Sequence, residues 1–294
     1  LQTQGLTVTQ NTEGTWKLPA EASAHELDVD NQTIVLLAMK TDDTFGAIEQ
    51  HSSLYRDLPL RSFQNGVTNE EWLSQKGFTT YGCTVMVGAE ITEPGNVRHS
   101  GGKLLEVGKW PSGNDLTSDA LVADLNESGM DASVDERVID GKWGKLVRNL
   151  ANAYLALTDL SVQEASCDPL DRQFIADVNE EAADVLELAD ISARMIGKRD
   201  LREQIARLRE PGFWPARPAV TETTRSYPST WQDLALRRER VEVDHFNGAI
   251  VRLWEKFHSP TPLNRVLRDR CVLAARNLTL PGSETSDSLR SAAL

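Results

Sequence analysis

Apolar positions follow two different patterns along this chain of 294 residues. In the first part, short continuous apolar runs lead straight into helix-prone segments: residues 33–39 (TIVLLAM) precede TDDTFGAIEQ, and residues 60–63 precede NGVTNEEWL. Such runs are typical of buried parallel strands, and the segments after them of crossover helices. Strand-like YGCTVMVGAEI, a Pro-Gly turn, KLLEVG and a helical segment at 116–128 continue this order. The pattern predicts an α/β fold with a mostly parallel sheet that ends near Asp140.

Beyond that point the alternation stops, and longer stretches of helical periodicity take over. Helices are predicted at 142–158, about 168–195, about 198–209 and about 240–258. Pro211, Pro215 and Pro218 interrupt them and predict a loop from about 210 to 228. The last dozen residues, SETSDSLRSAAL, are small and polar and predict a frayed tail.

The length of the chain suits two domains, each with a core of its own. The patterns place an α/β domain at residues 1–140 and an all-α domain at 141–294. No apolar run approaches the ~20 residues that cross a bilayer, so membrane insertion is not expected. Acidic residues outnumber basic ones by 44 to 31, and the net charge of −13 argues against nucleic acid as a partner. The three cysteines are widely separated and have no His-rich neighbours, which predicts no metal site, no disulfide framework and a cytoplasmic protein.

The most informative stretch is the helical run at 143–157, WGKLVRNLANAYLAL. At about 3.6 residues per turn, Lys145, Asn149 and Asn152 fall on one face. Beside that face runs an apolar stripe with the spacing of a core-facing surface, formed by Leu146, Leu150, Ala153 and Leu157. A lysine and two amides at the border of an apolar wall can act as a cationic acid and hydrogen-bond donors away from bulk water.

Four further positions are candidates for binding or catalysis, and each also has a plain structural interpretation. Lys40 and Asn65 follow predicted strands, and a doubly wound sheet binds ligands at the carboxyl ends of its strands. They could equally be a solvated lysine and a turn residue. Glu242 opens the predicted helix at 240–258, where a carboxylate also suits the helix dipole. Ser229 precedes a predicted WQDLAL helix and could be simply its N-cap.

A dinucleotide-binding domain should open with a strand, a GxGxxG turn and a helix, but this chain has no GxGxxG. The first residue is Leu1, and LQTQGLTVTQ is neither a signal peptide nor a transit segment. The chain therefore looks cut at its N-terminus, and either the fingerprint lies in the missing piece or the protein binds no dinucleotide.

Six segments together resemble 2-dehydropantoate 2-reductase, also called ketopantoate reductase. In order along the chain they are IVLLAMKTDDT, SFQNGVTNEE, EPGNVRHSG, KLVRNLANAYLAL, STWQDL and VEVDHFNGAIVRL. The resemblance implies a Rossmann domain followed by a helical domain. It also implies NADPH-dependent reduction of 2-oxo-pantoate to (R)-pantoate, in the route to pantothenate and coenzyme A.

By position, the resemblance implies that Lys145 is the general acid and that Glu242 is a carboxylate engaging the substrate near the reacting centre. It implies that Asn149 and Ser229 bind substrate. The positions that it places near the nicotinamide end of the cofactor are Lys40 and Asn65.

Three features depart from the family pattern. The family's second asparagine, eight residues after the lysine, is Ala153 here, and Asn152 stands one place earlier. One extra residue lies between Gln232 and Glu242. The glycine-rich phosphate loop and the strand end after it are absent, which fits a truncation of ~30 residues, the size of the missing first strand, helix and next strand. Reduction of another branched 2-oxo acid therefore stays an alternative, as does a noncatalytic two-domain fragment that cannot hold a cofactor. The long helices of the second domain could pair between the subunits of a homodimer or pack within one chain.

Overall fold

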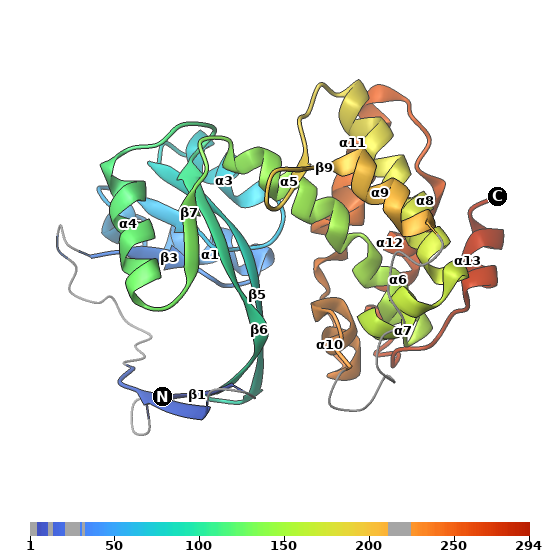
Figure 1. Ribbon diagram of the computed structural model, residues 1–294, viewed down its shortest axis with the longest axis horizontal. Coiled ribbons are helices and arrows are strands. Elements are labelled where there is room, and N and C mark those ends of the chain that lie inside the picture. The colour runs from blue at the N-terminus through green and yellow to red at the C-terminus, as the bar shows by residue number, and fades with distance from the viewer. Residues whose placement is uncertain (1–4, 11–13, 21–29, 31–32, 211–224) are drawn as a thin grey trace. The chain divides into compact units, whose positions relative to one another are not determined.

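A computed structural model describes all residues except 1–4, 11–13, 21–29, 31–32 and 211–224 (Figure 1). The chain forms two compact units, Leu1–Ile139 and Asp140–Leu294. The predicted loop at about 210–228 lies almost entirely outside the described residues.

The first unit is built on a mixed sheet, in which the described residues supply seven strands. They are β1 (Leu6–Gln10), β2 (Gly14–Leu18), β3 (Val35–Leu37), β4 (Leu60–Ser62), β5 (Thr80–Glu93), β6 (Asn96–Lys109) and β7 (Asp131–Val134). Their order is β2-β1-β6-β5-β4-β3, and β7 pairs with β6. The strands β3, β4 and β5 run parallel, as the apolar runs predict, whereas β5 and β6 form a long antiparallel hairpin.

The helices of this unit bury apolar side chains against the strands that they connect. They are α1 (Thr41–Gln50), α2 (Ser52–Tyr55), α3 (Thr68–Gln75) and α4 (Leu116–Glu127). One core cluster joins strand residues Leu37 and Leu60 to Ile48 of α1 and Leu73 of α3. Burial of such side chains stabilises the fold by about 1.5–3 kcal/mol each. The start of α4 is set by Asp115, which accepts hydrogen bonds from two backbone amides of the first turn.

The second unit is helical, apart from a hairpin of β8 (Arg194–Met195) and β9 (Arg199–Asp200). Its helical elements are α5 (Val138–Asn149, which starts at the end of the first unit), α6 (Ala151–Thr158), α7 (Val162–Cys167), α8 (Pro169–Leu188), α9 (Leu201–Arg209), α10 (Ser229–Ala235), the 3₁₀ turn η1 (Glu242–His245), α11 (Asn247–Phe257), α12 (Pro262–Arg276) and α13 (Ser286–Ala292). Tyr154, Phe174 and Phe246 are its largest fully buried side chains. The predicted Rossmann-type domain followed by a helical domain is thus confirmed.

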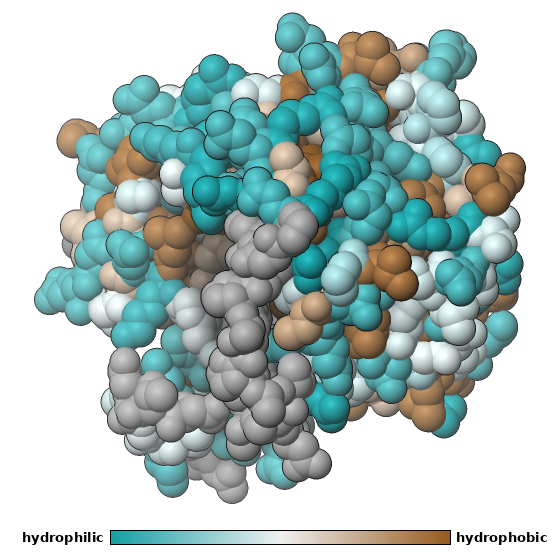
Figure 2. Space-filling model, turned by 45° about the vertical axis from the view of Figure 1, so that its right-hand side comes forward, coloured by the Kyte–Doolittle hydropathy of each residue, from teal (hydrophilic) through white to brown (hydrophobic). Residues whose placement is uncertain are grey.

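Figure 2 shows one face, on which hydrophobic side chains are scattered among hydrophilic ones, as on many folded proteins. Among the described helices, none combines the length and the apolar character that a membrane span needs.

The predicted frayed tail is wrong, because residues 286–292 form α13. Thr285 and Ser288 make a reciprocal capping box, so small polar residues start this helix rather than disorder it. Leu289 is fully buried, and Arg290 lies over the ring of Phe174 at 4.9 Å. The tail therefore belongs to the core of the second unit.

We expect Leu289→Ala to lower the free energy of unfolding by about 2–5 kcal/mol, because it leaves a cavity under α13. The measurement is urea unfolding followed by circular dichroism. Leu188→Ala, at a leucine that is 59% exposed, is the matched control and should change stability by less than about 0.5 kcal/mol. Equal effects of the two substitutions would contradict the docking of α13.

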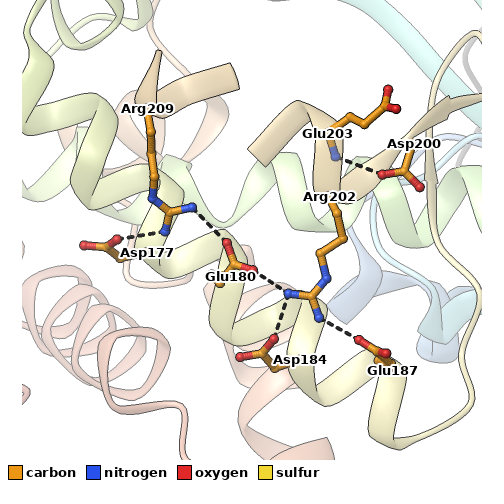
Figure 3. Close-up of polar contacts among 8 residues, drawn as sticks. All are labelled: Asp177, Glu180, Asp184, Glu187, Asp200, Arg202, Glu203 and Arg209. Carbon is orange, nitrogen blue, oxygen red and sulfur yellow. Dashed lines mark hydrogen bonds and ion pairs between the residues drawn. The ribbon is translucent and has the colours of Figure 1, made fainter. Parts of the chain in front are cut away.

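An ion-pair clamp joins α9 to α8 (Figure 3). Arg202 bonds to Glu180, Asp184 and Glu187, which lie on successive turns of α8. Arg209 bonds to Glu180 and to Asp177, one turn earlier. Burial alone would raise the pKa of Glu180, but the two guanidinium groups hold that pKa below the usual 4.5. The clamp is therefore charged at neutral pH.

Arg202→Met should lower the free energy of unfolding by about 1 kcal/mol at neutral pH, since the clamp is partly exposed and screened. A carboxylate whose pKa is lowered by folding stabilises the fold above its unfolded pKa, and this contribution is lost as pH falls through the folded value. The difference in melting temperature between protein and variant should therefore shrink below about pH 4.5 and in 1 M salt. Arg276→Met, at an exposed arginine with no ion pair among the described residues, is the control. A difference that is independent of pH and salt would rule out the clamp.

Candidate functional site

Lys40 and Asn65 both follow parallel strands of the first unit. Lys40 is the N-cap residue of α1, after β3, and Asn65 lies in the loop between β4 and α3. Both side chains are half-buried. Gly66, next to Asn65, has a φ of +79°, a conformation that favours glycine. The two residues therefore occupy equivalent places at one edge of the sheet, as predicted.

Two buried side-chain amides hold these loops together. Gln64 Nε2 donates to the backbone oxygen of Met39 at 2.8 Å and to Thr44 Oγ1 at 2.6 Å. Asn69 Nδ2 donates to Thr41 Oγ1 at 3.0 Å. The loop after β4 is thus linked to the loop after β3, and the first turn of α3 to the first turn of α1, which the sequence alone does not indicate.

The second set of predicted residues starts on α5, which carries Lys145 and Asn149, both half-buried. The predicted continuous helix is interrupted at Leu150, and Asn152 lies on the next helix, α6. At this break the amide of Leu150 bonds to Val147 O at 3.2 Å, a tight i−3 contact. The predicted apolar stripe is confirmed, since all four of its residues are buried.

Glu242 is buried, with 8% of its surface exposed. It opens the 3₁₀ turn η1 rather than an α-helix, because the chain bends at Phe246 (φ −111°, ψ −90°) before α11 begins. Arg268 Nε bonds to Asp244 Oδ1 at 2.6 Å, and Arg252 donates to Asp244 O at 3.1 Å. The hydrogen bond that Arg268 donates to the Asp244 carboxylate raises the pKa of Arg268. Two cations therefore hold the turn in place.

Ser229 is the first residue of α10, which packs against α6. The interpretation of Ser229 as N-cap is wrong, because Pro228 holds that position and no side chain caps the helix. Tyr227 and Trp231 stack at 3.9 Å on either side of Ser229 in the sequence, and Trp231 Nε1 donates to Asp159 at 2.8 Å. This leaves the Ser229 hydroxyl without a capping role.

Sequence reasoning missed Asn247, which connects these elements. Its side chain is fully buried, and Nδ2 donates to Leu150 O at 3.3 Å. The break after Asn149 and the segment that follows Glu242 are thereby brought together. The available signal was an amide inside the apolar run of the predicted helix at 240–258.

Gly144, directly before Lys145, packs against the hairpin of β8 and β9. A Cβ atom at this position would lie 1.9 Å from the backbone oxygen of Arg194. Only glycine therefore allows the hairpin to sit this close to α5.

Gly144→Ala should cost about 1–3 kcal/mol of stability, because either the hairpin or α5 must move. Gly46→Ala is the matched control, since Gly46 is exposed within α1 and a Cβ there meets open space. That control should gain about 0.5–1 kcal/mol from helix propensity. Urea unfolding of both variants measures the contrast, and a neutral Gly144→Ala would show that the hairpin is not tightly packed.

The second unit therefore offers an ammonium, amides, a hydroxyl and a buried carboxylate, whose residues are Lys145, Asn149, Asn152, Ser229 and Glu242. Side chains of these kinds can bind an anionic, carbonyl-bearing molecule and deliver a proton. Within the described part of the chain, no three His, Cys, Asp or Glu side chains group as metal ligands.

Known proteins resemble this chain along most of its length. Residues 1–112 match the family model Ketopantoate reductase PanE/ApbA, and residues 137–270 match Ketopantoate reductase PanE/ApbA C terminal. The 2-dehydropantoate 2-reductase of Pyrococcus horikoshii is 26% identical over 269 residues, which cover 91% of this chain and 81% of that protein.

Solved structures show the same similarity. The PanE/ApbA family ketopantoate reductase from Ralstonia eutropha JMP134 has a TM-score of 0.77 at 27% identity, over 94% of this chain and 86% of that one. D-mandelate dehydrogenase, solved with NADH and anilino(oxo)acetate, has a TM-score of 0.76 at 23% identity, with the same coverage of each chain. At that identity the second similarity concerns the fold.

Proposed function

The chain belongs to the ketopantoate reductase family, and we propose that it reduces 2-dehydropantoate, or a similar branched 2-oxo acid, to the 2-hydroxy acid with NADPH. Bound NADPH would supply a hydride to the 2-oxo carbon. The protein has to hold the substrate, stabilise the charge that grows on the carbonyl oxygen and deliver a proton to it.

The general acid in this proposal is Lys145. Its ammonium group transfers a proton from Nζ to the developing alkoxide and is left as a neutral amine. A positive charge at this place favours the transition state because negative charge grows there. Its half-buried position beside the buried stripe of α5 supports this role, since electrostatic interactions strengthen away from bulk water.

Substrate binding is assigned to Asn149, Asn152 and Ser229, whose amides and hydroxyl can hold the carboxylate or hydroxyl groups of the acid. Asn152 is proposed to take the place of the family's second asparagine, one residue earlier in the chain, in the first turn of the helix that begins after Leu150. Glu242 engages the substrate near the reacting centre.

Cofactor binding is assigned to the first unit, with Lys40 and Asn65 near the nicotinamide. The links made by Gln64 and Asn69 support this assignment. They hold two loops at the carboxyl ends of adjacent parallel strands, where doubly wound sheets bind their ligands.

The observation that carries the proposal is the family match in both units. The family model that matches residues 1–112 covers the candidate cofactor residues. The family model that matches residues 137–270 covers all five candidate residues of the second unit. A single-domain resemblance would support the fold of one half only.

Lys145→Ala should lower kcat by about 10²–10⁴-fold, the usual contribution of a general acid. Binding of NADPH should change little, because Lys145 acts on the substrate. Steady-state NADPH oxidation with 2-dehydropantoate measures the first effect, and the rise in melting temperature with NADPH measures the second. Lys256→Ala, at an exposed lysine of α11, is the control. Near-normal turnover in Lys145→Ala would remove the lysine from this role.

The same assays separate the alternatives. A panel of 2-oxo acids ranks substrates by kcat/KM, and a better substrate than 2-dehydropantoate would identify the physiological class. If millimolar NADPH leaves the melting temperature of this chain unchanged, the noncatalytic alternative is favoured.

A further inference from the structure

A pair of fully buried side-chain amides joins several helices of the second unit. Asn247 Nδ2 donates to Leu150 O at 3.3 Å and to Asn264 Oδ1 at 3.0 Å. Asn264 Nδ2 donates to Val178 O at 3.0 Å and to Glu181 Oε2 at 2.9 Å. Both N–H bonds of each amide are therefore used, which sets the orientation of both groups.

Glu181 of α8 anchors the far end of this pair. Its carboxylate accepts the backbone N–H groups of Leu263 and Asn264 at 2.9 and 3.0 Å, in the first turn of α12. The N-cap residue Thr261 gives that turn no side-chain hydrogen bond. Glu181 thus caps α12 from a neighbouring helix, and Asn264 is held in a fixed position.

The Asn247 end of the pair bonds to the chain directly next to candidate site residues. Leu150 directly follows Asn149, and Asn247 stands five residues after Glu242. At about 1.5 Å per helical residue, Lys145 lies about 7.5 Å along the helix axis from Leu150. One hydrogen bond therefore links the segment with the ammonium and the amide to the segment with the carboxylate.

This arrangement is costly for stability alone. Asn247 Oδ1 is buried and accepts no hydrogen bond among the described residues, and a buried acceptor without a partner lowers stability. A leucine of similar size would avoid that cost. An amide differs from leucine in its directional donors, so its contribution here is geometric rather than energetic.

We propose that Asn247 and Asn264 are positioning residues that align Lys145 with Glu242. This inference rests on the proposed function, because it concerns the same site. Neither asparagine is assigned a contact with the substrate; both act through the break at Leu150. An error of about 1 Å in the placement of a catalytic group can cost about 10²-fold in rate. Loss of the hydrogen bond from Asn247 to Leu150 should therefore appear mainly in kcat.

The test compares Asn247→Leu with Asn179→Leu. Asn179 of α8 is the matched control, because it is buried, its Oδ1 also lacks a partner among the described residues, and it makes no hydrogen bond to the break. Both variants are assayed well below their melting temperatures. Asn247→Leu should lower kcat by about 10–100-fold, with KM for NADPH nearly unchanged. It should also speed amide hydrogen exchange in residues 145–156, and the control should do neither.

Asn247→Asp provides a second test, a pH dependence of kcat that a general loss of packing would not produce. An ionised carboxylate cannot donate to Leu150 O, whereas a protonated one can. Its kcat relative to that of Asn247→Leu should therefore rise as pH falls. Glu181 and Asp244 are the same in both variants, so any effect that they have on the pH dependence cancels in this ratio.

The outcomes are distinct. Retention of kcat in Asn247→Leu within about twofold, or equal losses in Asn179→Leu, would overturn the proposal. If the unaltered protein reduces no 2-oxo acid, the proposed function fails. The hydrogen-exchange measurement then tests the positioning role by itself: unchanged exchange of residues 145–156 in Asn247→Leu would refute that role.

Discussion

The second unit depends on a hydrogen bond in its core, from the amide of Asn247 to the carbonyl of Leu150. Apolar packing around it brings helices together, but such packing is not directional and tolerates small shifts. A buried amide accepts only one orientation, because a misplaced donor leaves polar atoms unpaired in a dry interior. The relative position of the helix break and the turn that carries Glu242 is therefore determined by the geometry of a hydrogen bond rather than by the amount of buried surface.

The first unit uses the same principle with different residues. Gln64 is a buried side-chain amide that bridges the loops after β3 and β4, and Asn69 is one that joins the first turns of α3 and α1. The strands themselves hold these loops only through their ends, and loops are the mobile part of an α/β layer. Buried amides thus supply, in both units, the rigidity that candidate binding groups need from the structure behind them.

Charge contributes differently. The chain has a net charge of −13, and α8 alone carries a row of carboxylates that Arg202 and Arg209 partly neutralise. Such exposed pairs hold α9 against α8 with modest energy and respond to salt. The half-buried Glu181, in contrast, caps α12 through two backbone amides and is less exposed to the solvent that screens the clamp.

Local pattern was sufficient for the parallel strands, the helix at 116–128 and the apolar stripe beside Lys145, because periodicity within one strand or helix determines each of these. It also carried the resemblance to the family, since the motifs are short and keep their order. It was not sufficient for α13, where a capping box and one buried leucine outweigh a small, polar composition.

The sequence by itself therefore determined the two-part architecture and the candidate residues, because these follow from neighbours on the same element. The tertiary structure decided where the helix at 142–158 breaks and why Glu242 stands on a 3₁₀ turn before the bend at Phe246. At the break, the deciding contact joins residues 97 positions apart in the chain. No local pattern encodes such a pairing, since a polar side chain in an apolar run acquires its meaning only from the distant backbone group that it meets.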